Sequence, residues 1–179
     1  MLNNTNKKVI YAALFAALCC IGTMVIQIPV PATQGIVHLG DAFVILSGVV
    51  LGPFYGFLAA GIGSALANLL AGHVIWAPAT LLIKGGLALV SGLIWIWCKK
   101  HHKSRYIALT LAGVANMIMV ALGYFLYGGA IVVGFPAAAT GIPMDLLQGL
   151  AGLVLAQALF PILGAIPEIR EFMAVKSNH

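Results

Sequence analysis

The chain has 179 residues, of which 62% are hydrophobic and only 7% are charged, and its formal net charge is +5. A soluble domain carries roughly a quarter charged residues. The composition therefore excludes an exterior covered by water and predicts that lipid surrounds most of the surface. The length allows one compact unit, residues 1–179, without a separate soluble domain.

Apolar runs follow one another along the chain, separated by Pro, Gly and short charged clusters. A helix that spans a bilayer needs about 20 apolar residues. We predict an all-α, polytopic membrane bundle of six transmembrane helices, at about residues 9–28, 42–51, 54–72, 79–97, 106–127 and 143–166. The second run is too short to span a bilayer without help from its neighbours. Pro and Gly in the stretches 29–41 and 128–142 predict external loops.

The positive charges indicate topology and not a nucleic-acid partner. They cluster at Lys7 and Lys8, at 99–105, at Arg170 and at Lys176, whereas the predicted outer loops contain no Lys or Arg. The positive-inside rule places such clusters in the cytoplasm. Both termini are therefore expected to be cytoplasmic, in a multi-pass membrane protein.

Three ionisable residues are expected within the outer half of the membrane: Asp41, Lys84 and Asp145. Each needs a partner or a water-filled cavity there. Asp41 and Asp145 come near predicted helix starts, so each either caps a helix or binds a ligand. Lys84 is too deep for a cap, and it either pairs with one of these carboxylates or contacts a ligand.

Other polar and aromatic groups are predicted on the same side. Trp76 follows the third run and is either part of an interfacial aromatic belt or part of a site. The remaining candidates are His38, Asn68, Asn116 and Gln148. Together with the three ionisable residues they suit a small, polar, planar solute that enters from outside. Trp95 and Trp97 are expected to form a belt at the cytoplasmic side.

No pattern predicts catalysis or a resident cofactor. The chain lacks a Walker motif, a Ser nucleophile motif and metal-ligand spacing. Cys19, Cys20 and Cys98 lie in apolar stretches, so we expect free buried thiols. These absences favour a binding protein that takes its energy from a partner. The alternatives are a stand-alone permease, a lipid-modifying intramembrane enzyme and a structural membrane subunit.

Several stretches resemble the substrate-binding S components of energy-coupling factor (ECF) vitamin transporters. The similarity covers most of the chain and is most distinctive between His38 and Gly86. The stretches are His-Leu-Gly-Asp-Ala-Phe at 38–43, Leu-Gly-Pro-Phe-Tyr-Gly at 51–56, the small-residue run 61–70, His-Val-Ile-Trp-Ala-Pro at 73–78 and Ile-Lys-Gly-Gly at 83–86.

This resemblance implies partners and a substrate class. S components bind a vitamin or precursor from outside beneath a lid-like first loop. They associate with a transmembrane coupling subunit of the EcfT type and two ATPases. The small-residue face at Ala12 and Ala16 is similar to the pattern that docks on the coupling subunit. The His-Leu-Gly and Trp-Ala-Pro segments resemble the branch with hydroxymethylpyrimidine-, pyridoxine- and riboflavin-type members, and we favour a small pyrimidine or pyridine vitamin.

Overall fold

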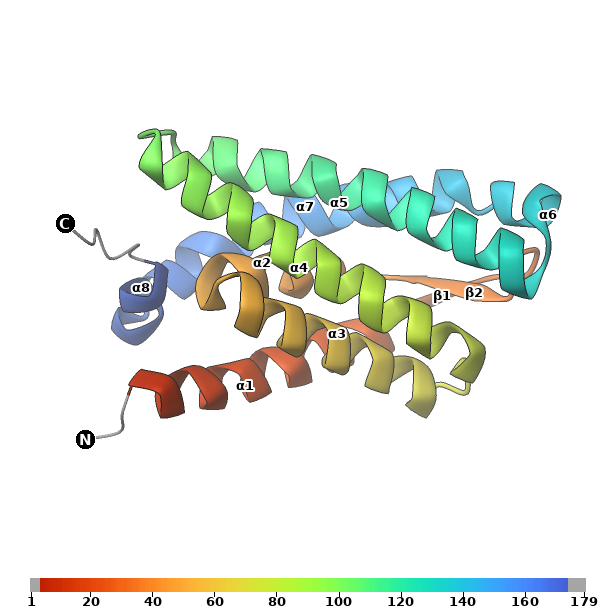
Figure 1. Cartoon of the computed structure of the whole chain (residues 1–179), viewed down its shortest axis with the longest axis horizontal. Coiled ribbons are helices and arrows are strands. Elements are labelled where there is room, and N and C mark those ends of the chain that lie inside the picture. The colour runs from red at the N-terminus through yellow and green to blue at the C-terminus, as the bar shows by residue number, and fades with distance from the viewer. Residues whose placement is uncertain (1–3, 174–179) are drawn as a thin grey trace.

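Eight α-helices and one β-hairpin make up residues 4–173, the part of the chain that the computed structural model describes (Figure 1). The long helices are α1 (Asn4–Met24), α3 (Pro53–Leu70), α4 (Ala77–Lys100), α5 (Arg105–Tyr127) and α7 (Ile142–Gly164). The short elements are β1 (Gln27–Val30), β2 (Gly35–His38), α2 (Asp41–Leu51), a 3-10 turn (Val74–Trp76), a π-helical turn (Gly128–Val132), α6 (Phe135–Ala139) and α8 (Pro167–Met173). The predicted all-α class is confirmed, with the hairpin as an addition.

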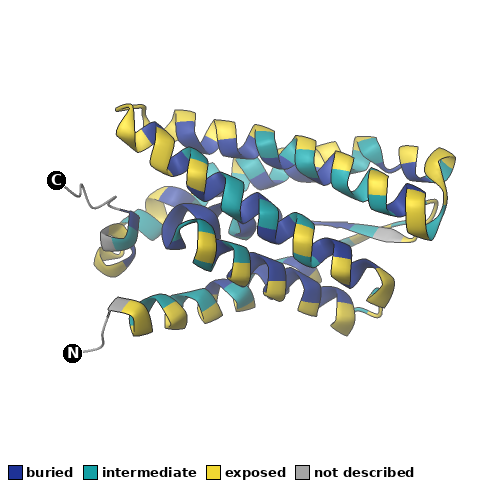
Figure 2. Cartoon of the chain, viewed as in Figure 1, coloured by how far each residue is buried: buried dark blue, intermediate teal, exposed yellow. Residues whose placement is uncertain are grey.

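Five of the described segments are long and apolar enough to cross a membrane. The remaining predicted run, the second in chain order, is the eleven-residue α2, and ten of its residues are buried (Figure 2). Helices α1, α3, α4 and α7 surround it. Because protein and not lipid encloses α2, its length need not match the thickness of the bilayer.

The first helix ends earlier than predicted, at Met24 and not near residue 28. Strand β1 pairs with β2 in antiparallel register, from Gln27 opposite His38 to Val30 opposite Gly35. Pro29 cannot donate the hydrogen bond that a helix requires, and a residue before proline is biased towards extended backbone. The stretch predicted as a loop is therefore partly a hairpin.

Two glycines determine how closely α2 approaches its neighbours. Gly52 has φ of +82°, and this conformation lets the chain reverse directly into Pro53 at the start of α3. A Cβ at Gly48 would collide with the backbone carbonyl of Ala88 on α4. This close contact brings α2 and α4 together, and with them the residues Asp41 and Lys84.

The two ends of the bundle differ in character. One end, called here the hairpin end, carries β1, β2 and α6; the other, the basic end, carries the start of α1, the turn between α4 and α5, and α8 (Figure 1). The basic clusters of the described chain lie at the basic end, and Lys176 is outside the described residues. Trp97 is 51% exposed there, as a belt residue would be, but Trp95 is buried against Phe160, so its prediction as a belt residue was wrong.

Candidate functional site

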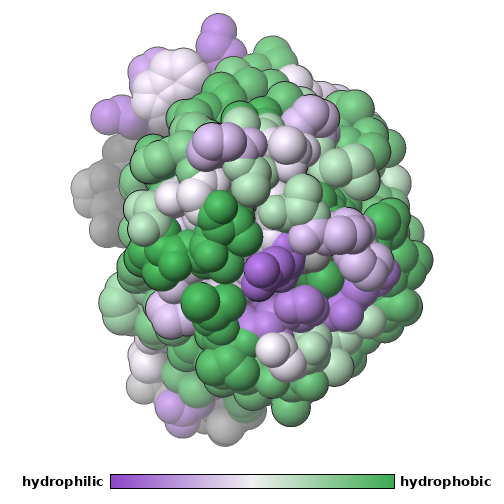
Figure 3. All heavy atoms as spheres, turned by 90° about the vertical axis from the view of Figure 1, so that its right-hand side faces the viewer, coloured by the Kyte–Doolittle hydropathy of each residue, from purple (hydrophilic) through white to green (hydrophobic). Residues whose placement is uncertain are grey.

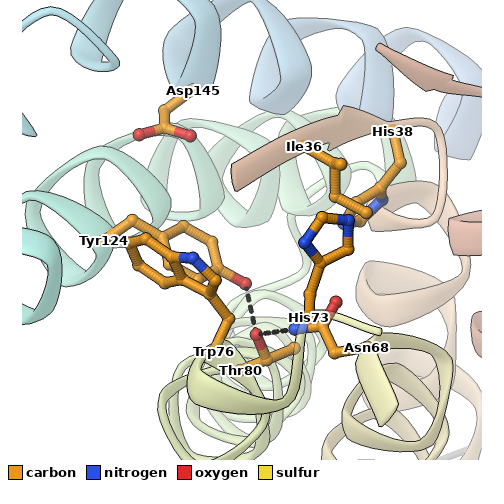
Figure 4. Close-up of a pocket in the computed structure, with 8 residues that line it drawn as sticks. All are labelled: Ile36, His38, Asn68, His73, Trp76, Thr80, Tyr124 and Asp145. Carbon is orange, nitrogen blue, oxygen red and sulfur yellow. Dashed lines mark hydrogen bonds between the residues drawn. The ribbon is translucent and has the colours of Figure 1, made fainter. Parts of the chain in front are cut away.

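A cavity opens at the hairpin end, with about 400 Å³ of empty space that is partly open to the surroundings. Its lining side chains come from strand β2, from the helices α3, α4, α5 and α7, and from the turn before α4 (Figure 4). Figure 3 shows that hydrophilic residues gather near the middle of this end and that hydrophobic ones surround them. The lining residues are Ile36, His38, Asn68, His73, Trp76, Thr80, Tyr124 and Asp145.

Two aromatic rings form one wall of the cavity. Trp76 and Tyr124 meet edge to face, with ring centroids 5.7 Å apart at 72°. The Trp76 indole Nε1–H also donates to the backbone carbonyl of Gln34 at 3.1 Å, in the turn between β1 and β2. This wall is therefore held against the hairpin and can stack against a planar ring.

A chain of hydrogen bonds joins three lining residues next to this wall. The Asn68 amide donates to the Thr80 hydroxyl at 2.6 Å, and that hydroxyl lies 3.0 Å from the Tyr124 hydroxyl. Asn68 and Thr80 are buried. Because α3, α4 and α5 each supply one group, the three helices together fix the orientation of this polar edge.

Asp145 lies across the cavity on α7 (Figure 4). It was predicted either to cap this helix or to contact a ligand. The helix is capped at Gly141 without a side-chain hydrogen bond, and the half-buried carboxylate forms no hydrogen bond or ion pair with the residues that the structure describes. Its acceptor oxygens are therefore free for a donor in the cavity.

His38 is the lining residue whose protonation the fold controls most directly. Its Nδ1 accepts the Gly40 backbone N–H at 3.1 Å, so the neutral ring carries its proton on Nε2. Burial, reinforced by the nearby Lys84 ammonium, lowers the pKa of His38 to about 4. The imidazole is therefore neutral at physiological pH and offers a hydrogen bond without a charge.

The remaining four predicted site residues form a buried cluster behind the cavity. Asp41 accepts the Lys84 ammonium at 2.5 Å through one oxygen, and both side chains are fully buried. Its other oxygen accepts the amides of Asn116 at 3.1 Å and Gln148 at 3.2 Å. The Gln148 carbonyl in turn accepts the His38 backbone N–H at 3.0 Å, which links the cluster to β2.

The structure thus separates the eight predicted substrate-binding residues into two sets. His38, Asn68, Trp76 and Asp145 line the cavity, while Asp41, Lys84, Asn116 and Gln148 support it from behind without lining it. Of the partners considered for Lys84, the carboxylate of Asp41 is the one it contacts.

Four lining residues were not predicted: Ile36, His73, Thr80 and Tyr124. A sequence signal existed for Thr80, because it lies four residues after Trp76 and four before Lys84. Residues at this spacing share one helix face. No group of three His, Cys, Asp or Glu side chains among the described residues could hold a metal ion.

A second feature bears on the predicted partner surface. An apolar groove, with about 1070 Å³ of partly open space, runs between α1 and α3. Ala12 and Ala16 line it and are half-buried, and a Cβ at Gly63 would collide with the backbone carbonyl of Ala16. Ala13 and Ala17 also line the groove and are exposed. The small residues thus allow α1 to approach α3 closely and leave a smooth outer surface.

Comparison with known proteins adds evidence of a different kind. A family described as "ECF-type riboflavin transporter, S component" matches residues 3–165. The chain is 34% identical over 145 residues to an uncharacterized protein "in gap 3'region" of Pyrococcus woesei, which covers 79% of this chain and 96% of that protein. It is 26% identical over 165 residues to the thiamine precursor transporter HmpT of Lactococcus lactis subsp. cremoris, over 91% and 92% of the two chains.

Two solved structures share the fold. One is the S component of a bacterial ECF transporter, with a TM-score of 0.67 and 19% identity over 90% of this chain and 98% of that one. The other is the S component for biotin from an ECF-type ABC transporter, with a TM-score of 0.64 and 16% identity over 90% and 95% of the two chains.

Proposed function

The chain belongs to the S components of ECF-type transporters, a transporter family and not an enzyme family, and from this premise we propose that it is the substrate-binding subunit of an ECF-type importer. It captures a small water-soluble vitamin or vitamin precursor at the hairpin end, outside the cell. The observation that carries the proposal is the cavity itself, in which an aromatic wall, a neutral imidazole and an unpaired carboxylate face one space.

The favoured solute is hydroxymethylpyrimidine or a pyridoxine-like ring. One six-membered heteroaromatic ring can stack on Trp76 and Tyr124 while its substituents reach the polar edges of the cavity. The Asp145 carboxylate can accept an exocyclic amino or hydroxyl group, and Asn68 can bond to the other side of the ring. The named function of the relative HmpT, a thiamine precursor transporter, supports the pyrimidine. Riboflavin is the third candidate, and its three fused rings and ribityl chain would need a longer cavity.

We propose that the hairpin is the lid of this site. Ile36 and His38 line the cavity from β2, and Trp76 bonds to the Gln34 carbonyl in the hairpin turn. The eight predicted residues then have two roles: four contact the solute or border it, and the buried cluster around Asp41 holds α2, α4, α5 and α7 in the binding geometry.

The energy for uptake comes, in this proposal, from a transmembrane coupling subunit of the EcfT type and two ATPases. The groove between α1 and α3, with Ala12 and Ala16, is the proposed docking surface. Both termini are proposed to be cytoplasmic in a prokaryotic cell membrane, because the basic end then satisfies the positive-inside rule. Residues 1–179 act as one substrate-binding unit.

The test is calorimetric titration of the detergent-purified chain with hydroxymethylpyrimidine, pyridoxine, riboflavin, thiamine and biotin, after mass spectrometry of any solute that co-purifies. We expect tight binding of one single-ring solute. Asp145→Asn should weaken that binding at least tenfold, since hydrogen bonds to a charged group contribute about 1.5–3 kcal/mol. Glu168→Gln, which removes an exposed carboxylate at the basic end, is the matched control and should bind as the unaltered chain does.

Two results would overturn the proposal. One is the absence of heat with every vitamin together with the absence of a co-purified solute. The other is uptake by the chain alone in energised vesicles without ATPases, which would support the stand-alone permease instead.

A further inference from the structure

A second cavity lies at the basic end, far along the bundle from the vitamin site. The ends of α4 and α7, the start of α5 and the helix α8 enclose about 600 Å³ of partly open space. Three of its lining residues are cations from three different helices: Lys99 on α4, Arg105 on α5 and Arg170 on α8. The vitamin-binding proposal uses none of them.

Among the side chains that the structure describes, these three cations have no acidic partner. None of them forms an ion pair with a side chain that the structure describes, and no carboxylate is among the described residues that line the cavity. On α8, Glu168 is two residues from Arg170, a spacing that puts the two on different helix faces. Three exposed positive charges around one cavity form a site for an anion.

The floor of the cavity is apolar and buried. Trp95 and Phe160 pack with ring centroids 5.3 Å apart, and the Trp95 indole donates to the Met173 backbone carbonyl at 3.3 Å. The cations extend over these rings: the Lys99 ammonium is 5.7 Å from the Trp95 ring centre, and the Arg105 guanidinium is 6.0 Å from that of Phe160. An inorganic anion would use only the cations, whereas an amphiphile would use both the cations and the floor.

The surroundings indicate where such an amphiphile comes from. Exposed apolar side chains flank the cavity on the long helices, including Trp97 at 51% and Ile162 at 64% exposure. Surfaces of this kind face lipid in a membrane protein. The cavity therefore lies where the apolar surface of the bundle gives way to its basic end, at the depth of phospholipid headgroups.

We propose that this cavity binds the headgroup of an anionic phospholipid. Arg105 and Arg170 hold the phosphate between them, Lys99 adds a third positive charge, and the start of an acyl chain lies against Trp95 and Phe160. Basic pockets between membrane helices are a known setting for such lipids. A bound lipid would also tie α8 to α4 and α5, so it should stabilise the bundle at this end.

The experiment measures lipid binding to the full chain in a neutral detergent by native mass spectrometry, with thermal unfolding as a second readout. The probes are dioleoylphosphatidylglycerol, dioleoylphosphatidylcholine and inorganic phosphate. We expect phosphatidylglycerol to bind at least tenfold more tightly than phosphatidylcholine and to raise the unfolding temperature. We expect inorganic phosphate to do neither at equal concentration.

Paired variants locate the site. Arg105→Gln with Arg170→Gln removes two cavity cations and should weaken phosphatidylglycerol binding about 30-fold, the factor for about 2 kcal/mol at about 1 kcal/mol per basic residue. Lys100→Gln with Lys103→Gln removes the same charge from the same end outside the cavity, and should weaken binding no more than about threefold. If the arginine pair does not yield folded protein, the single substitution Lys99→Gln at an exposed position replaces it. This variant should bind phosphatidylglycerol about fivefold more weakly.

Three outcomes would overturn the inference. Equal losses in the two pairs would mean that the lipid senses net charge and not this cavity. Equal binding of the two lipids would exclude recognition of the anion. A thermal shift with inorganic phosphate as large as that with phosphatidylglycerol would identify a free-phosphate site instead.

Discussion

Replacing Lys84 with methionine would remove the positive charge from the buried cluster and leave the Asp41 carboxylate without its ion-pair partner. Both side chains are fully buried, with the ammonium 2.5 Å from the carboxylate. After the substitution, Asp41 keeps only the neutral amide donors of Asn116 and Gln148. Removing one partner of a buried ion pair typically lowers the free energy of unfolding by about 3–5 kcal/mol, because an uncompensated charge stays in a low-dielectric interior.

The expected loss is large enough to measure by thermal unfolding. For a chain of this length, 1 kcal/mol shifts the midpoint by about 2–4 °C, so Lys84→Met should lower it by about 6–20 °C. Cys19, Cys20 and Cys98 are free and buried, so a thiol-reactive dye reports their exposure as the bundle opens. Vitamin affinity should fall sharply as well, since the cluster supports the cavity through the bond between Gln148 and the His38 backbone.

A double variant distinguishes the effect of the unpaired Asp41 charge from the effect of lost side-chain packing. Asp41→Asn with Lys84→Met removes both charges and keeps a carbonyl that can accept the two amides, so most of the lost stability should return. Lys100→Met, at an exposed position, is the matched control and should leave the midpoint within about 2 °C. An unchanged midpoint and affinity in Lys84→Met, or a double variant less stable than the single one, would refute the reasoning.

Three further changes test the lid, the docking surface and the imidazole. Trp76→Phe keeps a ring but removes the hydrogen bond to Gln34, so stopped-flow release of the vitamin should quicken about three- to tenfold, and an unchanged rate would contradict the lid. Ala12→Leu with Ala16→Leu should abolish vitamin uptake into cells, while calorimetry should show that vitamin binding is retained. Loss of uptake and binding together would mean that this face serves packing within the bundle. The contribution of His38 to the unfolding midpoint, measured at each pH as the difference between the unaltered chain and His38→Gln, should be level above pH 6.5 and fall towards pH 4. The reason is that the unfolded chain binds a proton with the ordinary histidine pKa of 6.5, whereas folded His38 has a pKa of about 4. A difference that stays constant over this pH range would contradict the assignment to His38.

Composition and local chemistry were enough to determine the class and the rough elements. Long apolar runs predict membrane helices, because lipid offers no hydrogen bonds to the backbone and a helix satisfies its backbone groups within its own segment. The sequence also identified the rare polar residues among the apolar runs as candidates for the site, since an ionisable group such as Lys84 inside a membrane protein needs a partner or a cavity. Most of these residues proved to lie in the cavity or directly behind it.

Tertiary structure alone decided which polar residue does what. Asp41 and Asp145 both come at helix starts and look alike in sequence, yet one is paired with Lys84 and the other faces the cavity unpaired. The difference depends on how close α2 comes to α4, and Gly48 permits that approach across a gap of forty residues in the chain. Likewise, Trp95 lies between charged and apolar residues like any belt tryptophan, and only the packing of α7 and α8 buries it. Such contacts join residues far apart in sequence, so local pattern carries little information about them.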